Sequence, residues 1–404
     1  MTRSKKEDPR KEALVEELLA KPVGPETKRR KPSTKDFTKK LEVTGKTLTA
    51  TIRDAEGTVN EGTAISYLEE EGLTPEDWVA TSFRKVKYGN VDQPMESVTF
   101  AFRKATDDDL PEALNIDELV KAIRVDRKRK PLVRSAGSHT YIVAIGDMQF
   151  GKIDGDGVAG TLDRTIKAID NAALQLAWYR KRFDIGHVHI AWLGDHIEGF
   201  VSQGGSNVWR TVLTLNEQIR LTRRVMLHAL LVFGPLADRV TMAAVPGNHG
   251  EAVRFNGKGM TRYDDSHDTE SLIAVADACK LTPERFEHVE FFVPETDELT
   301  VTTELSGTIV AHAHGHQWRP GKHFEWWKGQ AFNKGSALHT ADVLLAGHLH
   351  HEHVDTDGWR TFMQPPAMES ESTWWKHATG TTGAPGLVVA ITKDGIVNTR
   401  EVVR

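Results

Sequence analysis

The sequence contains a single cysteine, Cys279, in 404 residues. One cysteine cannot form a disulfide within the chain, which excludes a small secreted fold held together by disulfides. Apolar runs are also short, and none approaches the roughly 18 residues of a transmembrane helix. The opening stretch, MTRSKKEDPRKE, is charged and precedes no apolar segment of the kind that a secretory signal needs. We therefore expect a cytoplasmic protein without a membrane partner.

Internal repeats and low-complexity segments are absent too, and the net charge is only −5. This near balance hides a basic segment, because residues 1–40 hold thirteen Lys and Arg against seven Asp and Glu. A basic tail can hold a polyanion without setting specificity. It can equally be a solvated tail without a ligand, and the sequence leaves both interpretations open.

Hydrophobic patterning divides the chain into four parts. Residues 1–40 form the basic tail, which we expect to be disordered. Residues 41–104 have the strand and helix patterns of a small α+β domain. Its strand over residues 78–88 carries basic and aromatic side chains that would either bind nucleic acid or form a solvated face over an aromatic core. Residues 105–138 contain a helix and a basic linker, and residues 139–404 form the main domain.

Five apolar segments of the main domain each end in glycine and side chains able to bind a metal. They read YIVAIGD, VHIAWLGD, VTMAAVPGNH, TIVAHAHGH and DVLLAGHLH. Such segments are typical of buried strands, and helical patterns over residues 161–182, 207–233 and 267–279 alternate with the first three. This alternation, followed by a strand-rich half, predicts an α/β fold with paired sheets flanked by helices.

Because ligands bind at the carboxyl ends of strands in such sheets, we expect the side chains at these ends to meet. They are Asp147, Asp195, Asn248, His249, His314, His348 and His350. For each of them, the alternative is an ordinary turn or capping residue at a strand end.

The predicted donors combine hard oxygen atoms with imidazole nitrogens, a mixture that suits Mn²⁺, Fe²⁺ or Zn²⁺ better than Ca²⁺ or Mg²⁺ alone. Without His249, the set offers six ligands, which exceed what one catalytic metal with an open position needs. Two metals that share a carboxylate would use all six. We therefore predict two divalent metal ions, with Mn²⁺ preferred and Fe²⁺, Zn²⁺ or Mg²⁺ as alternatives. His249 follows the ligand Asn248 directly and is placed to donate a proton or a hydrogen bond to a bound phosphate.

The motifs GDMQ, GDHIE, GNH, HGH and GHLH, in this order, resemble the five signature blocks of the calcineurin-like metallophosphoesterases. The resemblance covers residue 141 to the C-terminus and implies a four-layer αββα metallophosphoesterase sandwich, here with a small α+β N-terminal domain. It implies that Asp147 and His350 hold the first metal, that Asp195 bridges the two metals, and that His249 is the catalytic histidine. The residues that it assigns to the second metal are Asn248, His314 and His348.

Three positions depart from the family pattern. Gln149 stands where the first block usually has a histidine, so its carbonyl oxygen would serve as a weaker ligand of the first metal. Glu198 replaces the usual second aspartate of the second block. Gly250 stands where an acidic residue usually follows Asn-His.

Within the family, FVSQGGSNVWRT and VPGNHGEAVR resemble DNA exonucleases of the SbcD type and their phage-encoded relatives. Those enzymes carry a DNA-capping domain after the catalytic domain, whereas the additional domain here precedes it. An ATPase partner of the SbcD kind is therefore not expected, and a homodimer stays open. A phage-encoded protein of this type would act in the host cytoplasm.

Four residues beside the motifs are candidates for substrate contact: Arg210, Arg254, Trp318 and Arg319. Trp318 could stack on a base, and the arginines could contact phosphate groups near the metals. Core packing of the tryptophan and surface salt bridges of the arginines are the alternatives.

From these observations we predict a two-metal phosphodiesterase that hydrolyses nucleic-acid phosphodiester bonds, as a DNA exonuclease or endonuclease in repair or replication. The basic tail and linker favour nucleic acid over small substrates. The alternative enzyme is a phosphomonoesterase or a hydrolase of small phosphodiesters. A second alternative is a non-catalytic nucleic-acid-binding protein with a degenerate phosphoesterase fold, which Gln149 favours.

Overall fold

The computed structural model describes residues 39–55, 59, 61–74, 77–90, 93–104, 115–123, 137–202, 211–255, 258–259, 261–370 and 383–404. The chain divides into two compact units, residues 1–105 and 106–404. Residues 1–38 of the predicted basic tail, and the basic stretch 127–131, lie outside the described residues. Within the described residues, every helix falls short of the length and apolar character of a membrane span.

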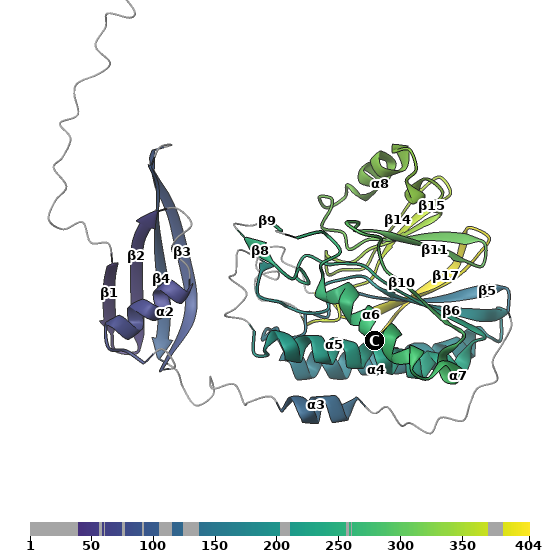
Figure 1. Ribbon diagram of the computed structural model, residues 1–404, viewed down its shortest axis with the longest axis horizontal. Helices are drawn as coiled ribbons and strands as arrows, with labels where there is room; N and C mark the ends of the chain where they lie inside the picture. The colour runs from purple at the N-terminus through teal and green to yellow at the C-terminus, as the bar shows by residue number, and fades with distance from the viewer. Residues whose placement is uncertain are drawn as a thin grey trace, which may run out of the picture. The chain divides into compact units, whose positions relative to one another are not determined.

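The first unit is an antiparallel sheet in the order β1-β2-β4-β3 with one helix, α2, lying across it (Figure 1). The bounds are β1 Lys39–Thr44, β2 Thr47–Ala55, α2 Glu61–Glu70, β3 Trp78–Asn90 and β4 Gln93–Lys104. Val98, Phe100 and Phe102 of β4 are buried, while Thr99 and Ala101 between them are partly exposed. This alternation is what a half-buried strand requires, and one face of the sheet forms the core of the unit.

The larger sheet of the second unit has the order β10-β7-β6-β5-β16-β17. Strands β10, β7, β6 and β5 are parallel, and β16 and β17 add an antiparallel edge. The bounds are β5 His139–Ile145, β6 Ile185–Trp192, β7 Arg239–Ala244, β10 Val289–Phe292, β16 Leu387–Lys393 and β17 Ile396–Val403. Because β6 lies inside the sheet with both faces covered, every one of its residues is buried.

The smaller sheet has the order β11-β12-β13-β15-β14, with β12, β13 and β15 parallel and an antiparallel strand at each edge. The bounds are β11 Val301–Leu305, β12 Thr308–His312, β13 Val343–Leu345, β14 His353–Asp357 and β15 Arg360–Gln364. A short separate pair is formed by β8 Arg254–Phe255 and β9 Lys258–Gly259.

The two sheets pack face to face. Ala144 and Ala191 from the larger sheet share a buried cluster with Leu345 and Met363 from the smaller one. The other face of the larger sheet packs against α4, α5 and α6, and the other face of the smaller sheet packs against α8. Figure 1 shows the resulting order of helices, sheet, sheet and helix. The predicted four-layer αββα sandwich is therefore confirmed.

The helices of the second unit are α3 Ile116–Ala122, α4 Gly157–Tyr179, α5 Leu215–Phe233, α6 His267–Lys280, α7 Pro283–Phe286 and α8 His323–Phe332. Short 3₁₀ turns follow α5 and α8, at Gly234–Leu236 and Ala337–His339. Helix α3 is the helix predicted within residues 105–138, and it packs on the core of this unit through Leu119 and Ile123. The helix α8 was not predicted.

A layer of polar side chains lies between the two sheets. His189 Nε2 is 2.8 Å from His312 Nε2, and His189 Nδ1 is 2.7 Å from the Thr241 hydroxyl. His187 contacts the same hydroxyl at 2.8 Å and the Thr140 hydroxyl at 3.0 Å. Burial, together with the charge of nearby Arg239, lowers the pKa of His187 to about 3. These histidines are neutral structural residues, because burial penalises the charged ring.

The low pKa of His187 makes stability depend on acidity. A histidine in the unfolded chain has a pKa near 6.5. Below that pH the unfolded chain binds a proton that His187 does not bind in the folded protein, and this favours unfolding. This contribution is complete above pH 6.5 and is lost as pH falls toward 3. We expect His187→Gln to reduce the loss of unfolding free energy between pH 7 and pH 5 by about 2 kcal/mol. Urea titrations at both pH values measure this loss, with the exposed His339→Gln as control. The prediction would be contradicted if the wild type and both variants lost the same unfolding free energy between pH 7 and pH 5.

Candidate metal centre

The predicted donors lie in the turns that follow β5, β6, β7, β12 and β13. Five of them have a left-handed backbone: Asp147 (φ 52°), Gln149 (43°), Asp195 (51°), His348 (76°) and His350 (59°). Among the described residues, the other non-glycine positions with positive φ are Asp297, Ser306 and Asp394. Each left-handed residue costs roughly 1–2 kcal/mol, so such residues persist only where their surroundings hold them, commonly at functional sites.

The carboxylate of Asp268, near the start of α6, holds two of these turns together. It accepts hydrogen bonds from the backbone N–H groups of Asp195 (3.1 Å), His196 (3.0 Å) and Gly247 (2.9 Å). The turns after β5 and β6 are joined in turn by a bond from the Gln149 N–H to the Asp195 carbonyl, 2.9 Å long. The backbone that carries the donors is thus fixed from both sides.

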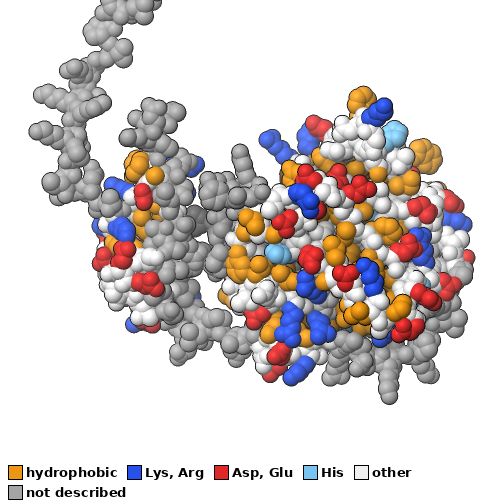
Figure 2. Space-filling model, in the orientation of Figure 1, with side chains coloured by type: hydrophobic (Ala, Val, Ile, Leu, Met, Phe, Trp, Pro, Cys, Tyr) orange, Lys and Arg blue, Asp and Glu red, His pale blue; other side chains and the backbone are white. Residues whose placement is uncertain are grey.

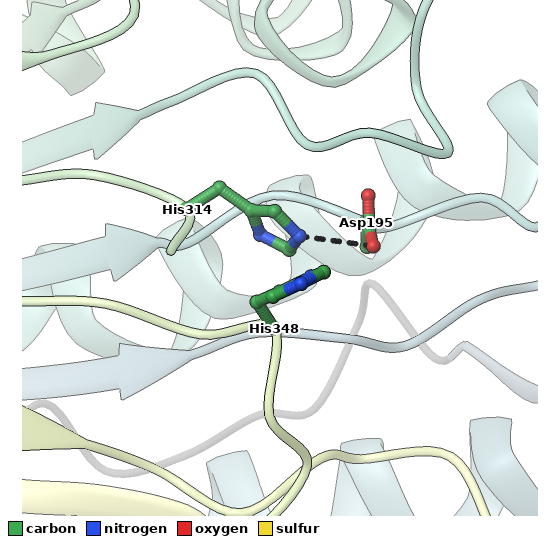
Figure 3. Close-up of side chains that lie close together, drawn as sticks. All are labelled: Asp195, His314 and His348. Carbon is green, nitrogen blue, oxygen red and sulfur yellow. Dashed lines mark ion pairs between the residues drawn. The ribbon is translucent and has the colours of Figure 1, made fainter. Parts of the chain in front are cut away.

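Site A consists of Asp195, Asn248, His314 and His348. His314 Nε2 lies 3.0 Å from Asp195 Oδ2 and 3.2 Å from Asn248 Oδ1. Ligand atoms of Asp195, His314 and His348 all lie within 4.8 Å of one another, and Figure 3 shows the three side chains pointing toward a common space. One carboxylate, one amide oxygen and two imidazoles form a donor set that fits a borderline divalent cation.

The charges within site A also suit a metal. The Nδ1 atom of His314 bonds to the Leu193 carbonyl at 2.7 Å, which directs Nε2 toward the oxygen donors. Burial by itself would lower the pKa of His314, but the Asp195 carboxylate raises it to about 9. A divalent cation would replace the proton that Nε2 carries at neutral pH. Burial and the neighbouring His314 lower the pKa of His348 to about 4, so His348 is already a neutral ligand.

Site B consists of Asp147, Gln149 and His350, and the bridging role predicted for Asp195 would make it a further member. His350 Nε2 lies 3.3 Å from Asp147 Oδ1, a buried oxygen that accepts no hydrogen bond of normal geometry among the described residues. Burial opposes protonation of His350, yet Asp147 and Glu369 raise its pKa to about 10. Asp147 and His350 therefore face each other as two ligands of the same metal ion would. The side-chain oxygen of Gln149 accepts a hydrogen bond from Lys152 Nζ at 3.0 Å instead.

His249 lies beside both sites and is 6% exposed. Its backbone N–H donates to Asp195 Oδ1 at 2.7 Å, and its Nδ1 lies 3.0 Å from the Glu198 carbonyl and 3.1 Å from the Ser202 hydroxyl. Burial would lower the pKa of His249, but Asp195 and Glu198 raise it to about 9. The ring is held in one orientation and carries a proton at neutral pH, as a donor to phosphate must.

The candidate substrate contacts fare differently. Arg210 lies outside the described residues, and Arg254 begins β8 with a side chain that is not described. Arg319 is exposed. Trp318 is only 9% exposed, with its ring centroid 4.5 Å from that of Trp326, in the core between α8 and the smaller sheet. The predicted base-stacking position of Trp318 is therefore wrong, because the unpredicted helix α8 packs its ring into a core.

Three residues of the site were missed at the level of sequence: Asp268, Lys152 and Glu369. Glu369 Oε1 lies 3.0 Å from His350 Nδ1, and Glu369 Oε2 lies 2.9 Å from Lys152 Nζ. None of the three belongs to a metal-binding motif. The one available signal was Ser266, which caps the start of α6 and so indicates that Asp268, two positions later, lies in the first turn of a helix.

No protein-family model and no curated protein matches the chain. Solved structures with some similarity include a predicted phosphoesterase from Streptococcus pneumoniae, at 14% identity over 63% of this chain and 84% of that one, with a TM-score of 0.28. Vacuolar Protein Sorting 29 from Cryptosporidium parvum has 14% identity over 65% of this chain and 97% of its own, with a TM-score of 0.30. An archaeal phosphodiesterase has 12% identity over 65% and 99%, with a TM-score of 0.28. Likeness this low transfers no activity to the chain.

The close approach of two turns makes Gly247 irreplaceable. A Cβ at this position would lie 2.1 Å from Asp195 Oδ1 and 2.2 Å from the Asp195 nitrogen. We expect Gly247→Ala to displace Asp195, to lower metal content, and to destabilise the protein by about 2 kcal/mol. In α8, by contrast, a Cβ at Gly329 meets nothing within 4 Å, so Gly329→Ala should stabilise by about 0.5–1 kcal/mol. Urea unfolding and metal analysis check both, and a Gly247→Ala protein that matches the wild type in both would refute this geometry.

Proposed function

We propose that the protein is a metal-dependent phosphodiesterase that hydrolyses nucleic acid. The observation that carries the proposal is the convergence of two carboxylates, an amide oxygen and three imidazoles next to a protonated, oriented histidine. Asp195 belongs to site A, is the predicted bridge to site B and also accepts the His249 backbone N–H, so donors and proton donor share one rigid framework. Such an arrangement serves phosphoryl transfer, in which catalysis depends mainly on positioning and charge.

The chemistry divides between the metal centre and His249. A bound divalent cation supplies positive charge that polarises a phosphoryl oxygen and makes a water more acidic. Sites A and B would hold such cations through Asp147, Asp195, Asn248, His314, His348 and His350. His249 donates a hydrogen bond to a phosphate oxygen, and Glu198 and Ser202 keep its ring in place through Nδ1.

The choice of nucleic acid as substrate rests on the basic sequence segments 1–40 and 127–131. The face of the second unit drawn in Figure 2 is not basic in this way. Its described positive and negative side chains are interspersed on that face. As far as its side chains are described, this face has no uniformly basic surface. Attraction of the phosphate backbone is therefore assigned to the basic segments, and hydrolysis to the metal centre.

A substrate comparison tests the proposed function. With Mn²⁺ present, we expect cleavage of single- or double-stranded DNA and of an aryl phosphodiester, and much slower turnover of an aryl phosphomonoester. Hydrolysis of the monoester with DNA left intact would instead identify a phosphomonoesterase. DNA binding without cleavage of any substrate would identify a non-catalytic binding protein.

Two substitutions separate metal binding from proton donation. His249→Ala keeps the backbone N–H that bonds to Asp195, so it should retain metal while turnover falls by roughly 10²–10⁴-fold. Asp195→Ala removes the carboxylate that serves both sites and should lose both metal and activity. Metal analysis of purified protein and a cleavage assay measure these effects, with the exposed His351→Ala as control. An Asp195→Ala protein with full metal content and activity would overturn the ligand assignment.

A further inference from the structure

Sites A and B differ in the state of their side chains. The four donors of site A come from four different turns, and their ligand atoms face one another. In site B, the carbonyl oxygen of Gln149 is engaged by Lys152 Nζ at 3.0 Å. This oxygen is the only atom of the Gln149 side chain that can bind a metal, because the amide nitrogen has no lone pair to give. One of the two lone pairs of this oxygen is therefore used by Lys152, and Gln149 offers site B a weaker ligand than a histidine would.

The Lys152 ammonium is firmly anchored. Its Nζ lies 2.9 Å from Glu369 Oε2, and the two side chains are 11% and 4% exposed. Glu369 is itself fixed, because its backbone N–H donates to the Asp147 carbonyl at 3.1 Å. The backbone of Lys152 forms a bridge with Thr211. A displaced lysine would leave the buried Glu369 carboxylate paired with His350 alone, which is unfavourable.

A continuous chain of contacts connects this ammonium to the donors of site B. Glu369 Oε1 lies 3.0 Å from His350 Nδ1, and His350 Nε2 lies 3.3 Å from Asp147 Oδ1. Glu369 thus connects the Lys152 ammonium to His350, and the same ammonium contacts Gln149 directly. A cation entering site B meets an ammonium that Glu369 holds in place, and a Gln149 oxygen that already accepts a hydrogen bond from that ammonium. Among the residues of site A, the contacts described include no lysine or arginine.

We propose that Lys152 is a built-in cation that partly takes the place of the first metal, so that the protein holds one divalent ion tightly in site A and a second one only weakly in site B. This inference rests on the proposed function in one respect, the assignment of both sites to metals. It makes Lys152 and Gln149 positioning residues that set metal stoichiometry. The substrate phosphate would then be held by one resident ion and one that exchanges with the solution.

Metal stoichiometry tests this asymmetry without reference to turnover. Full-length protein is saturated with Mn²⁺, passed through a desalting column and analysed for metal, and its spectrum is recorded by electron paramagnetic resonance. We expect one Mn²⁺ per chain with the spectrum of an isolated ion. Calorimetric titration should show a second site at least tenfold weaker. In His348→Ala the retained ion should be lost, whereas in His350→Ala it should remain.

Converting site B to the usual pattern should restore the second ion. In the double variant Gln149→His, Lys152→Met, we expect two retained Mn²⁺ per chain and the spectrum of a coupled pair. The matched control is Lys167→Met, which removes an exposed lysine on α4 that pairs with Asp163. It should retain one ion, as the wild type does.

The outcomes distinguish this inference from the proposed function. Two equally tight ions in the wild type, or a retained ion that depends on His350 and not on His348, would overturn the asymmetry and leave a metal-dependent phosphodiesterase intact. A double variant that still retains one ion would overturn the role of Lys152 and Gln149. Absence of any Mn²⁺ binding by calorimetry would overturn the proposed function itself.

Discussion

The carboxylate of Asp268 is the contact on which the metal centre depends. By accepting three backbone N–H groups, it joins the turn after β6 to the turn after β7. Asp195 lies in the first turn and Gly247 in the second, and the space between them admits no Cβ. The left-handed backbone of Asp195 is unfavourable alone and is offset by this long-range hydrogen bonding. The donors of the larger sheet are therefore held in fixed positions, where Asp195 meets His314 from the smaller sheet.

Charge balance inside that volume is the second constraint. Two buried carboxylates, Asp147 and Asp195, could not stay ionised without nearby positive charge. Protons on His314 and His350 supply it when no metal is bound, which is why the pKa values of both imidazoles rise despite burial. In site A, a divalent cation would take the place of the proton on His314. In site B, Lys152 adds a permanent charge, and this makes the two halves of the centre chemically unequal.

Local sequence predicts the strands and their turns well, because each depends on a short apolar run that ends in glycine. The buried β6 and the donors that follow it are an example, whereas β4 is predicted from the alternation of apolar and other residues along it. Helix α8 escaped prediction because its apolar residues follow no clear period and it contains Gly329. Burial of Trp318 depends on the outer face of the smaller sheet, which a linear pattern does not reveal. For the same reason Trp318 looks like a substrate contact in the sequence and lies in a core in the structure.

The sequence by itself determined the type of fold, the five strand-end motifs and the kinds of donor atoms, because these follow from hydrophobic period and side-chain chemistry over a few residues. Only the tertiary structure decided which partners the donor side chains of sites A and B contact. Asp268 is 73 positions from Asp195, and Glu369 is 19 from His350. Their contacts arise when layers of the sandwich close. Whether the Gln149 oxygen faces a metal or the Lys152 ammonium was settled the same way, by the packing of Glu369 against the end of β5.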